Sequence, residues 1–279
     1  MSGMIKVALA GIDGNMGGLV AKTVLEDPEL ELVAGFTIPE SPNKGKDIGI
    51  YHGVNPIGIP ISSSEDIEKI LKNTKPDVYV DFTLAKAAEK NCLIVAENKI
   101  KSVIGTTALS EGFLSSFKDK LKKQGTTAVI SPNMSLGVNI LFKLSNQLTK
   151  LLSTYDIEIT EAHHHRKKDV PSGTAMELAQ IIAAALNKNI DEVGKFGRAK
   201  GFNPRKIGAE EIGIHALRAG DIVGEHTILY AGPGERIEVT HRAHSRQCFA
   251  AGTIVAIKFL NEKGESGRIY SMQDVLGLS

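Results

Sequence analysis

The chain has 279 residues, of which 42% are hydrophobic and 23% are charged, and these are the proportions of a globular protein with room for two domains of ordinary size. A formal net charge of +1 gives no electrostatic reason to expect nucleic acid or an anionic membrane surface as a partner. Two cysteines are too few for a disulfide framework, and no apolar run approaches the roughly 20 residues that cross a bilayer, so we expect a cytoplasmic protein.

The first 36 residues predict a strand, a glycine turn, a helix and a second strand. Ile5–Ala10 is apolar enough for a buried strand, and Gly11, Gly14 and Gly17 follow it at once. Residues 18–26 continue as a helix, Asp27 and Pro28 end it, and residues 30–36 form the next strand. This order is typical of a dinucleotide-binding fingerprint, in which the glycines let the backbone approach a pyrophosphate.

The same alternation continues through the first half of the chain. It predicts strands at 77–83, 102–106 and 127–130 and helices at 84–98 and 111–123. Such a rhythm favours a doubly wound parallel sheet of the Rossmann type. Ligands of these sheets bind beyond the carboxyl ends of the strands, where segments 11–17, 81–83, 105–107 and 131–134 fall.

The second half predicts a different architecture. A long amphipathic helix at 136–152 leads to a strand at 155–162, and residues 191–206, with three glycines and a proline, predict a long loop. Residues 211–244 predict antiparallel strands joined by turns at 219–221 and 231–234, and a helix at 254–260 follows them. We therefore expect a dinucleotide-binding domain of residues 1–133 plus about 247–279, and a separate α+β mixed-sheet domain of residues 134–246.

The segment 161–174 carries the strongest chemical signal, because it places three consecutive histidines and two lysines just before a predicted helix. Thr174 and Glu177 have the spacing of a capping box at the start of that helix. Free backbone N–H groups at a helix start favour a carboxylate or a phosphate, and Gly173 has no Cβ to keep a ligand away from them. The sequence thus predicts a site that binds a small acid and moves protons.

Two other interpretations of this segment stay open at this point. A basic run in a loop is often only a solvated surface. Adjacent histidines suggest metal less strongly than histidines at i and i+4, and the chain has no H-E-x-x-H motif, so we expect no metal site.

The end of the second predicted strand bears on the choice of cofactor. An acidic residue there would hold the ribose 2′-hydroxyl of NAD, but this chain has Thr37 followed by Ile38. Lys44 and Lys46 lie just downstream, either as solvated loop residues or as contacts to a 2′-phosphate. With no carboxylate expected beside the ribose, we expect use of both NADH and NADPH.

These motifs together resemble those of one enzyme family over nearly the whole chain. They are Gly11-x-x-Gly14-x-Met16-Gly17, Asp81-Phe-Thr83, Gly105-Thr-Thr107, Pro132-Asn-Met-Ser135, Glu161-Ala-His-His164, Lys167-x-Asp169-x-Pro-Ser-Gly-Thr174, Gly224-Glu-His226 and Met272-Gln-Asp-Val-Leu276. The chain resembles the 4-hydroxy-tetrahydrodipicolinate reductases, also called dihydrodipicolinate reductases, of lysine and diaminopimelate biosynthesis. The resemblance implies reduction of a cyclic dicarboxylate by NADH or NADPH, and a homotetramer formed through the sheet of the second domain.

The resemblance also implies roles for particular residues. His163 and Lys167 would move protons, and the substrate carboxylates would be bound by His164, Ser172, Gly173 and Thr174. The nucleotide would contact Gly11, Ile12, Asp13, Gly14, Asn15, Met16, Gly105, Thr106, Thr107, Ser131, Pro132, Asn133 and Met134, with Thr37 beside the ribose. The family often has arginine or lysine where this chain has Asn15, and often an acidic and then a basic residue where this chain has Thr37 and Ile38. His165 and Lys168 carry no assigned role.

Two other functions remain as alternatives. Another nicotinamide-dependent amino-acid or oxo-acid dehydrogenase would share the two-domain build but act on a different substrate. A non-enzymatic nucleotide sensor would need the glycine turn but not the proton-moving pair His163 and Lys167.

Overall fold

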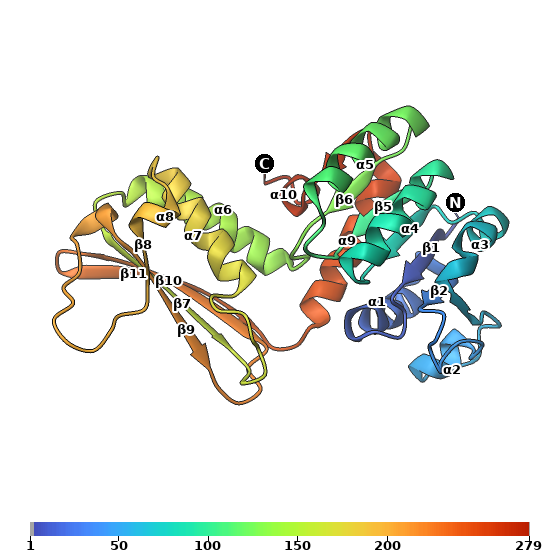
Figure 1. Ribbon diagram of the computed structural model, residues 1–279, viewed down its shortest axis with the longest axis horizontal. Coiled ribbons are helices and arrows are strands. Elements are labelled where there is room, and N and C mark those ends of the chain that lie inside the picture. The colour runs from blue at the N-terminus through green and yellow to red at the C-terminus, as the bar shows by residue number, and fades with distance from the viewer. Residues whose placement is uncertain (1–2, 279) are drawn as a thin grey trace. The chain divides into compact units, whose positions relative to one another are not determined.

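In the computed structural model, which describes residues 3–278, the chain folds into two compact units. The first unit combines residues 1–136 with residues 247–279, and the second consists of residues 137–246. Figure 1 labels most of the helices and strands of both units. Among the described residues, no helix has the length and apolar character needed to cross a membrane.

The first unit is built on a seven-stranded sheet in which every neighbouring pair is parallel. In sheet order the strands are β12 (Ile269–Tyr270), β6 (Ala128–Ile130), β5 (Lys101–Ile104), β4 (Val78–Asp81), β1 (Ile5–Ala10), β2 (Leu30–Thr37) and β3 (Ile61–Ser63). The order reverses between β1 and β4, and open sheets of this kind bind ligands at that point, beyond the carboxyl ends of the strands. The predicted doubly wound parallel sheet is confirmed.

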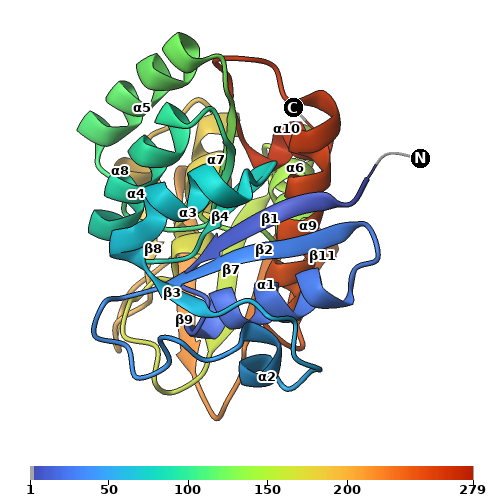
Figure 2. The ribbon, with the colours of Figure 1, turned by 90° about the vertical axis from the view of Figure 1, so that its right-hand side faces the viewer.

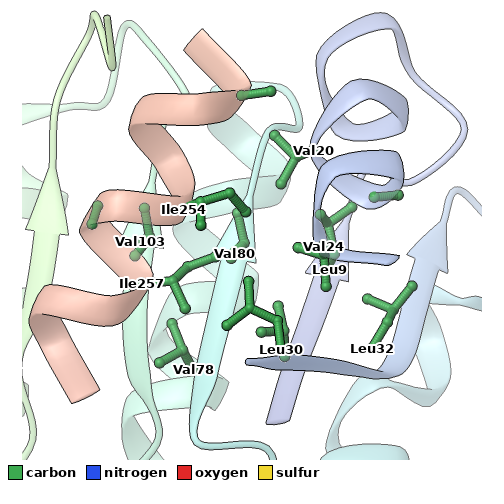
Figure 3. Close-up of a cluster of buried hydrophobic side chains, with 14 of the residues drawn as sticks. Leu9, Val20, Val24, Leu30, Leu32, Val78, Val80, Val103, Ile254 and Ile257 are labelled. Carbon is green, nitrogen blue, oxygen red and sulfur yellow. The ribbon is translucent and has the colours of Figure 1, made fainter. Parts of the chain in front are cut away.

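Helices pack on both faces of this sheet (Figure 2). One face is covered by α1 (Asn15–Glu26), α9 (Gln247–Lys263) and α10 (Met272–Val275), and the other by α3 (Ile67–Thr74), α4 (Ala85–Glu97) and α5 (Glu111–Gln124). On the first face, Val24 of α1 and Ile257 of α9 are fully buried with Leu9 and Val80 of the sheet (Figure 3). The strands are buried on both faces, which explains why their sequences are almost continuously apolar.

The boundaries of several elements differ from the prediction. Helix α1 begins at Asn15 rather than at residue 18, because Gly14 already has the extended backbone of an N-cap. Helix α9 begins seven residues before the predicted 254, at Gln247. Residues 48–74 were not assigned, and they form α2 (Ile48–His52), β3, a short 3-10 helix (Ser64–Asp66) and α3.

The second unit has a mixed five-stranded sheet, as predicted. In sheet order its strands are β11 (Glu235–Ala243), β10 (Gly224–Gly232), β7 (Asp156–His163), β9 (Ile212–Arg218) and β8 (Gly194–Phe196). Strand β7 lies in the middle, antiparallel to β10 and parallel to β9. One face packs against α6 (Leu136–Leu151), α7 (Gly173–Ala185) and α8 (Ile190–Val193) in a common hydrophobic core.

The predicted turn at 219–221 does not join two paired strands, because β7 lies between β9 and β10. The connection between β9 and β10 passes around the end of β7 instead. There Ala219 N–H donates to the carbonyl of His163 at 2.9 Å, and His165 N–H donates to the carbonyl of Gly220 at 3.2 Å. The expected turn at 219–221 therefore closes over the histidine segment.

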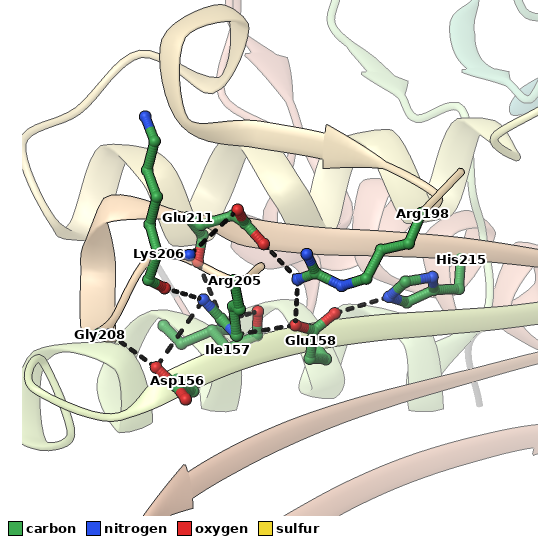
Figure 4. A network of polar contacts seen from close by, with 9 residues as sticks. All are labelled: Asp156, Ile157, Glu158, Arg198, Arg205, Lys206, Gly208, Glu211 and His215. Carbon is green, nitrogen blue, oxygen red and sulfur yellow. Dashed lines mark hydrogen bonds and ion pairs between the residues drawn. The ribbon is translucent and has the colours of Figure 1, made fainter. Parts of the chain in front are cut away.

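The segment 191–206 is not an unstructured loop. It contains most of α8 and all of β8, and ion pairs hold the remainder against β7 and β9 (Figure 4). Arg198 pairs with Glu211 and Glu158, and Arg205 Nε lies 2.9 Å from Glu158 Oε1. These contacts join charged residues that are far apart in sequence, which explains why the local sequence pattern predicts only a loop.

Candidate active site

The glycine turn of the first unit has the backbone geometry that a bound pyrophosphate needs. Gly11 has a φ of +77°, in the left-handed region that favours glycine. A Cβ on Gly17 would lie 2.0 Å from the carbonyl oxygen of Gly11, so only glycine lets α1 start this close to the turn. The N-cap Gly14 offers no side-chain hydrogen bond, which leaves the first N–H groups of α1 for an anion.

Asp13, inside this turn, makes a contact that the sequence did not reveal. Its Oδ1 accepts a hydrogen bond from Thr37 Oγ1 at 2.7 Å, and its Oδ2 accepts from Ser41 Oγ at 2.6 Å and from Asn43 Nδ2 at 3.2 Å. The inference that no carboxylate lies at the end of the second strand is therefore wrong. The third residue of the glycine turn supplies one.

A second network lies at the carboxyl ends of β4 and β5. Asp81 is fully buried, and its Oδ1 accepts from Thr83 N–H at 2.9 Å, from Thr83 Oγ1 at 2.6 Å and from Thr106 Oγ1 at 2.9 Å. A Cβ on Gly105 would lie 2.2 Å from the ring of Phe82. The network thus fixes the two segments 81–83 and 105–107 that the sequence singled out.

The segment 131–134 follows directly after β6, whose last residue is Ile130. Ser131 Oγ donates to the carbonyl of Asn133 at 2.8 Å, which holds the segment in a tight turn. All the predicted nucleotide-binding segments thus lie at the carboxyl edge of one parallel sheet.

In the second unit, Glu161 of β7 is the centre of the histidine segment. Its side chain is fully buried, and Oε2 lies 2.6 Å from His163 Nδ1. Arg218 of β9 donates to both carboxylate oxygens at 2.8 Å, and Ser172 N–H donates to Oε1 at 3.0 Å. Burial alone would raise the pKa of Glu161, but these hydrogen bonds outweigh it and lower the pKa below its usual value.

These contacts orient the imidazole of His163. An ionised Glu161 accepts a hydrogen bond from the Nδ1–H group, so Nε2 is the ring atom left to exchange a proton with a ligand. Nε2 faces Gly224 of β10, where a Cβ would lie only 3.1 Å away. Burial lowers the pKa of His163, the nearby charges of Lys167 and Arg218 lower it further, and Glu161 acts in the opposite direction. The net shift is downward, so the ring is neutral at pH 7.

The N-cap of α7 is Ser172, so the predicted capping box at Thr174 and Glu177 is wrong. Ser172 Oγ accepts from Ala175 N–H at 3.2 Å and lies 3.1 Å from His226 Nε2. Its N–H binds Glu161, and its carbonyl accepts from Met176 N–H. Each polar group of Ser172 thus has a partner within the protein.

His226 of β10 is a buried histidine that the sequence reasoning left without a role. It is 4% exposed and its ring packs edge-on against His163, with 5.3 Å between the ring centres. Burial, together with the nearby His163, lowers the pKa of His226 to about 3. His226 is therefore neutral at pH 7, and its Nε2 can accept the hydroxyl proton of Ser172.

The remaining predicted residues surround this group. Lys167 Nζ lies 2.9 Å from Asp169 Oδ2, and its charge acts on both His163 and His226. Nδ1 of His164 is buried and has no protein partner among the described residues. A Cβ on Gly173 would meet no protein atom within 4 Å, so the space at the first residue of α7 is open.

The structure joins His163 to Ser172, the N-cap of α7, through Glu161, and adds Arg218 and His226 to the group. Glu161 could have been found from the sequence, because residues two apart on a strand share a face. Arg218 could not, since only the register of β9 on β7 places it opposite His163. Within residues 3–278 no group of three metal-binding side chains is formed.

Comparisons with known proteins agree with this geometry. The family model for the N-terminus of dihydrodipicolinate reductase matches residues 5–134, and that for the C-terminus matches residues 137–276. The chain is 48% identical over 276 residues to the 4-hydroxy-tetrahydrodipicolinate reductase of Methanocaldococcus jannaschii, covering 99% of this chain and 98% of that protein. It is 44% identical over 276 residues to the enzyme of the same name from Methanothermobacter thermautotrophicus, covering 99% and 100%.

Among solved structures, the chain is similar to a dipicolinate-bound dihydrodipicolinate reductase from Paenisporosarcina sp. TG-14. The TM-score is 0.77 at 24% identity, and the match covers 97% of this chain and 98% of that one. This likeness shows the fold.

A parallel sheet with a glycine turn, joined to a unit that carries a buried histidine site, defines a nicotinamide-dependent oxidoreductase. The two family models and the full-length relatives make the assignment specific. The chain belongs to the dihydrodipicolinate reductase family.

The pKa of His226 predicts an acid sensitivity that one substitution removes. An unfolded histidine binds a proton below about pH 6.5, whereas His226 in the folded protein binds one only near pH 3. Between these values the unfolded state holds one more proton, so the free energy of unfolding falls by about 1.4 kcal/mol for each unit of pH decrease. In His226→Gln this contribution is absent, and urea unfolding between pH 7 and pH 4 should show a shallower loss of stability.

The matched control is His244→Gln, which removes an exposed histidine of the same unit. It should keep the slope of the parent protein. Parallel stability curves for His226→Gln and the parent would contradict the neutral, buried state of His226.

Proposed function

We propose that the chain reduces 4-hydroxy-tetrahydrodipicolinate, by way of dihydrodipicolinate, to tetrahydrodipicolinate at the histidine site of the second unit. The observation that carries this proposal is the buried Glu161, which orients His163 next to the open start of α7. A sensor that only binds a nucleotide has no use for such a group. Reduction of a cyclic dicarboxylate needs groups that attract its carboxylates and a group that carries protons. This site offers the ammonium of Lys167 and the start of α7 for the first task, and His163 for the second.

The residues at the carboxyl edge of the first unit fit a dinucleotide. The turn from Gly11 to Met16 would hold the pyrophosphate at the start of α1, with segments 105–107 and 131–134 beside the rest of the cofactor. When bound, the reduced nicotinamide supplies the hydride that is added to the substrate ring. The first unit thus serves as the cofactor domain, and the second as the substrate domain.

The substrate carboxylates would be bound by His164, by Thr174 and by the backbone at Gly173. The open space at Gly173 lets a carboxylate approach the positive end of the helix dipole at the start of α7. Ser172 is left out of this set, because its polar groups are all engaged in the helix cap and with Glu161. The ammonium of Lys167 adds positive charge on the side of His163.

His163 and Lys167 balance the protons of the reaction. Loss of water moves a proton from a ring carbon to the departing hydroxyl, and Nε2 of neutral His163 can accept and return it. Hydride addition to the ring then requires one further proton, which Lys167 donates. The two negative charges of the bound substrate stabilise the imidazolium that forms when Nε2 takes up the proton from the ring carbon.

Removal of either proton carrier should lower turnover without unfolding the protein. His163→Ala and Lys167→Ala should each reduce kcat by about 10²–10⁴, the usual contribution of a general acid or base. Steady-state kinetics with freshly prepared substrate measures this loss, and the affinity for NADH serves as the check on folding.

Lys168→Ala is the matched control, because Lys168 is exposed and lies next to Lys167 in the same segment. It should retain the kcat of the parent protein. Parent-like kcat in both His163→Ala and Lys167→Ala would remove them from the mechanism.

A separate prediction concerns the proposed carboxylate-binding site at Gly173, at the start of α7. In Gly173→Ala the new methyl group meets no protein atom, so folding is preserved, but it occupies the space proposed for a substrate carboxylate. Affinity for the inhibitor-like ligand pyridine-2,6-dicarboxylate should fall at least about tenfold, by calorimetric titration, while NADH affinity stays constant.

Gly112→Ala adds the same methyl group to an equally open position near the start of α5 and should change neither affinity. Equal dicarboxylate binding in Gly173→Ala and Gly112→Ala would show that the carboxylates bind elsewhere.

We also propose that the chain forms a homotetramer in the cytoplasm through its second unit. The helices of this unit pack on one face of its sheet, and segment 196–207 displays Phe196, Phe202 and Ile207, whose exposures are 53%, 99% and 88%. Large exposed apolar side chains of this kind favour association with further copies of the chain.

Light scattering of the purified protein should give four times the chain mass; the mass of a single chain would contradict the assembly. The net charge of +1 favours neither nucleic acid nor a membrane as an additional partner.

A further inference from the structure

We propose that Asp13 makes the cofactor site selective for NADH over NADPH. This inference rests on the proposed cofactor role of the first unit. It assigns to a residue of the glycine turn the task that an acidic residue at the end of the second strand performs in other dinucleotide-binding sheets.

The position of the Asp13 carboxylate is the first argument. Thr37 is the last residue of β2, which is where the acid that holds the ribose 2′-hydroxyl of NAD is expected. Asp13 Oδ1 lies 2.7 Å from Thr37 Oγ1, so the carboxylate reaches this place from the glycine turn that follows β1. The charge is therefore present beside the ribose although residue 37 itself is neutral.

The state of the carboxylate is the second argument. Partial burial raises the pKa of Asp13, but the hydrogen bonds from its three neighbours outweigh burial and bring the pKa below its usual value. Asp13 is thus ionised throughout the range in which the protein would work. A 2′-phosphate placed beside it would meet a fixed like charge, whereas a neutral 2′-hydroxyl would meet no such repulsion and could donate to the carboxylate.

The nearby lysines do not cancel this charge directly. Lys46 Nζ donates to Asn43 Oδ1 at 2.8 Å and lies over the ring of Tyr51, 5.9 Å from its centre. Lys44 Nζ donates to the carbonyl of Pro39 at 3.1 Å. Neither ammonium has an ion pair with Asp13, and each already has a partner within the protein.

The contact with Asp13 also determines what a substitution at Thr37 would do. The Thr37 side chain is only 4% exposed, and its hydroxyl donates to Asp13. An aspartate at position 37 would place two carboxylates in contact without a positive charge between them. Thr37→Asp is therefore a test of stability, and Asp13 is the residue to change in a test of cofactor choice.

The experiment measures binding of the two reduced cofactors, with no substrate present, by following nucleotide fluorescence on titration. The parent protein should bind NADH at least about tenfold more tightly than NADPH. In Asp13→Asn, which keeps the size of the side chain and removes its charge, that ratio should fall at least about tenfold, mainly through tighter NADPH binding. Asparagine could disturb the hydrogen bonds to Ser41 and Thr37, so Asp13→Ala is a second variant that removes the charge without adding an amide. It should change the ratio in the same direction.

A second pair of probes isolates the adenosine end of the cofactor. Displacement of NADH by AMP and by adenosine 2′,5′-bisphosphate should show the parent protein favouring AMP and Asp13→Asn losing that preference. Glu40→Gln is the matched control, because it removes one exposed carboxylate from the same loop region and should keep the parent ratio.

The outcomes separate this inference from the proposed function. Equal affinity of the parent for NADH and NADPH, or an unchanged ratio in both Asp13 variants, would overturn the role of Asp13 while leaving the cofactor site in place. Failure of the parent protein to bind either nucleotide would instead overturn the proposed function itself.

Discussion

The second unit depends on one buried charge, the carboxylate of Glu161. A carboxylate with no exposed surface is stable only when it is paired and hydrogen-bonded, and removing one partner of such a group typically costs about 3–5 kcal/mol. Here the partners come from β7 itself, from Arg218 of β9 and from the backbone just before α7. Compensation of this single charge therefore fixes the relative positions of the strand, the sheet neighbour and the helix start that form the site.

The same compensation explains how the site can attract a dianion. Glu161 is hidden beneath His163, whereas Lys167 and the backbone at Gly173 lie at least partly exposed to solvent. A ligand in the open space therefore meets positive charge and N–H groups, while the negative charge that orients the imidazole is buried behind it. His226, neutral and packed on His163, adds no further charge that would repel a proton.

How much of this follows from sequence depends on whether the contact is local. The glycine turn and the segment 161–174 could be recognised, because their chemistry is contained in a few consecutive residues. Strand β3, with three residues, is too short for its alternation to be distinguished from a turn. Asp13 with Thr37, and Arg218 with Glu161, are brought together by strand register, which no periodicity in a single sequence encodes.

The strand order of the second sheet is another feature that tertiary contacts decide. The amphipathic pattern of residues 136–152 predicts α6 to within one residue of its end. The sequence pattern does not predict that β7 lies between β9 and β10. Two consecutive strands with a short connection ordinarily pair, and here the connection is instead hydrogen-bonded around the end of β7. The alternative order became visible only with the tertiary contacts that hold residues 219 and 220.

The contribution of α9 to the first unit has a consequence for synthesis on the ribosome. Ile254, Ile257 and Leu260 complete the hydrophobic layer on one face of the parallel sheet, and β12 extends the sheet beyond β6. Both elements are translated after the entire second unit. The contiguous residues 137–246 can therefore finish folding while the earlier-made strands still expose an apolar face, which reverses the usual order in which the N-terminal domain folds first.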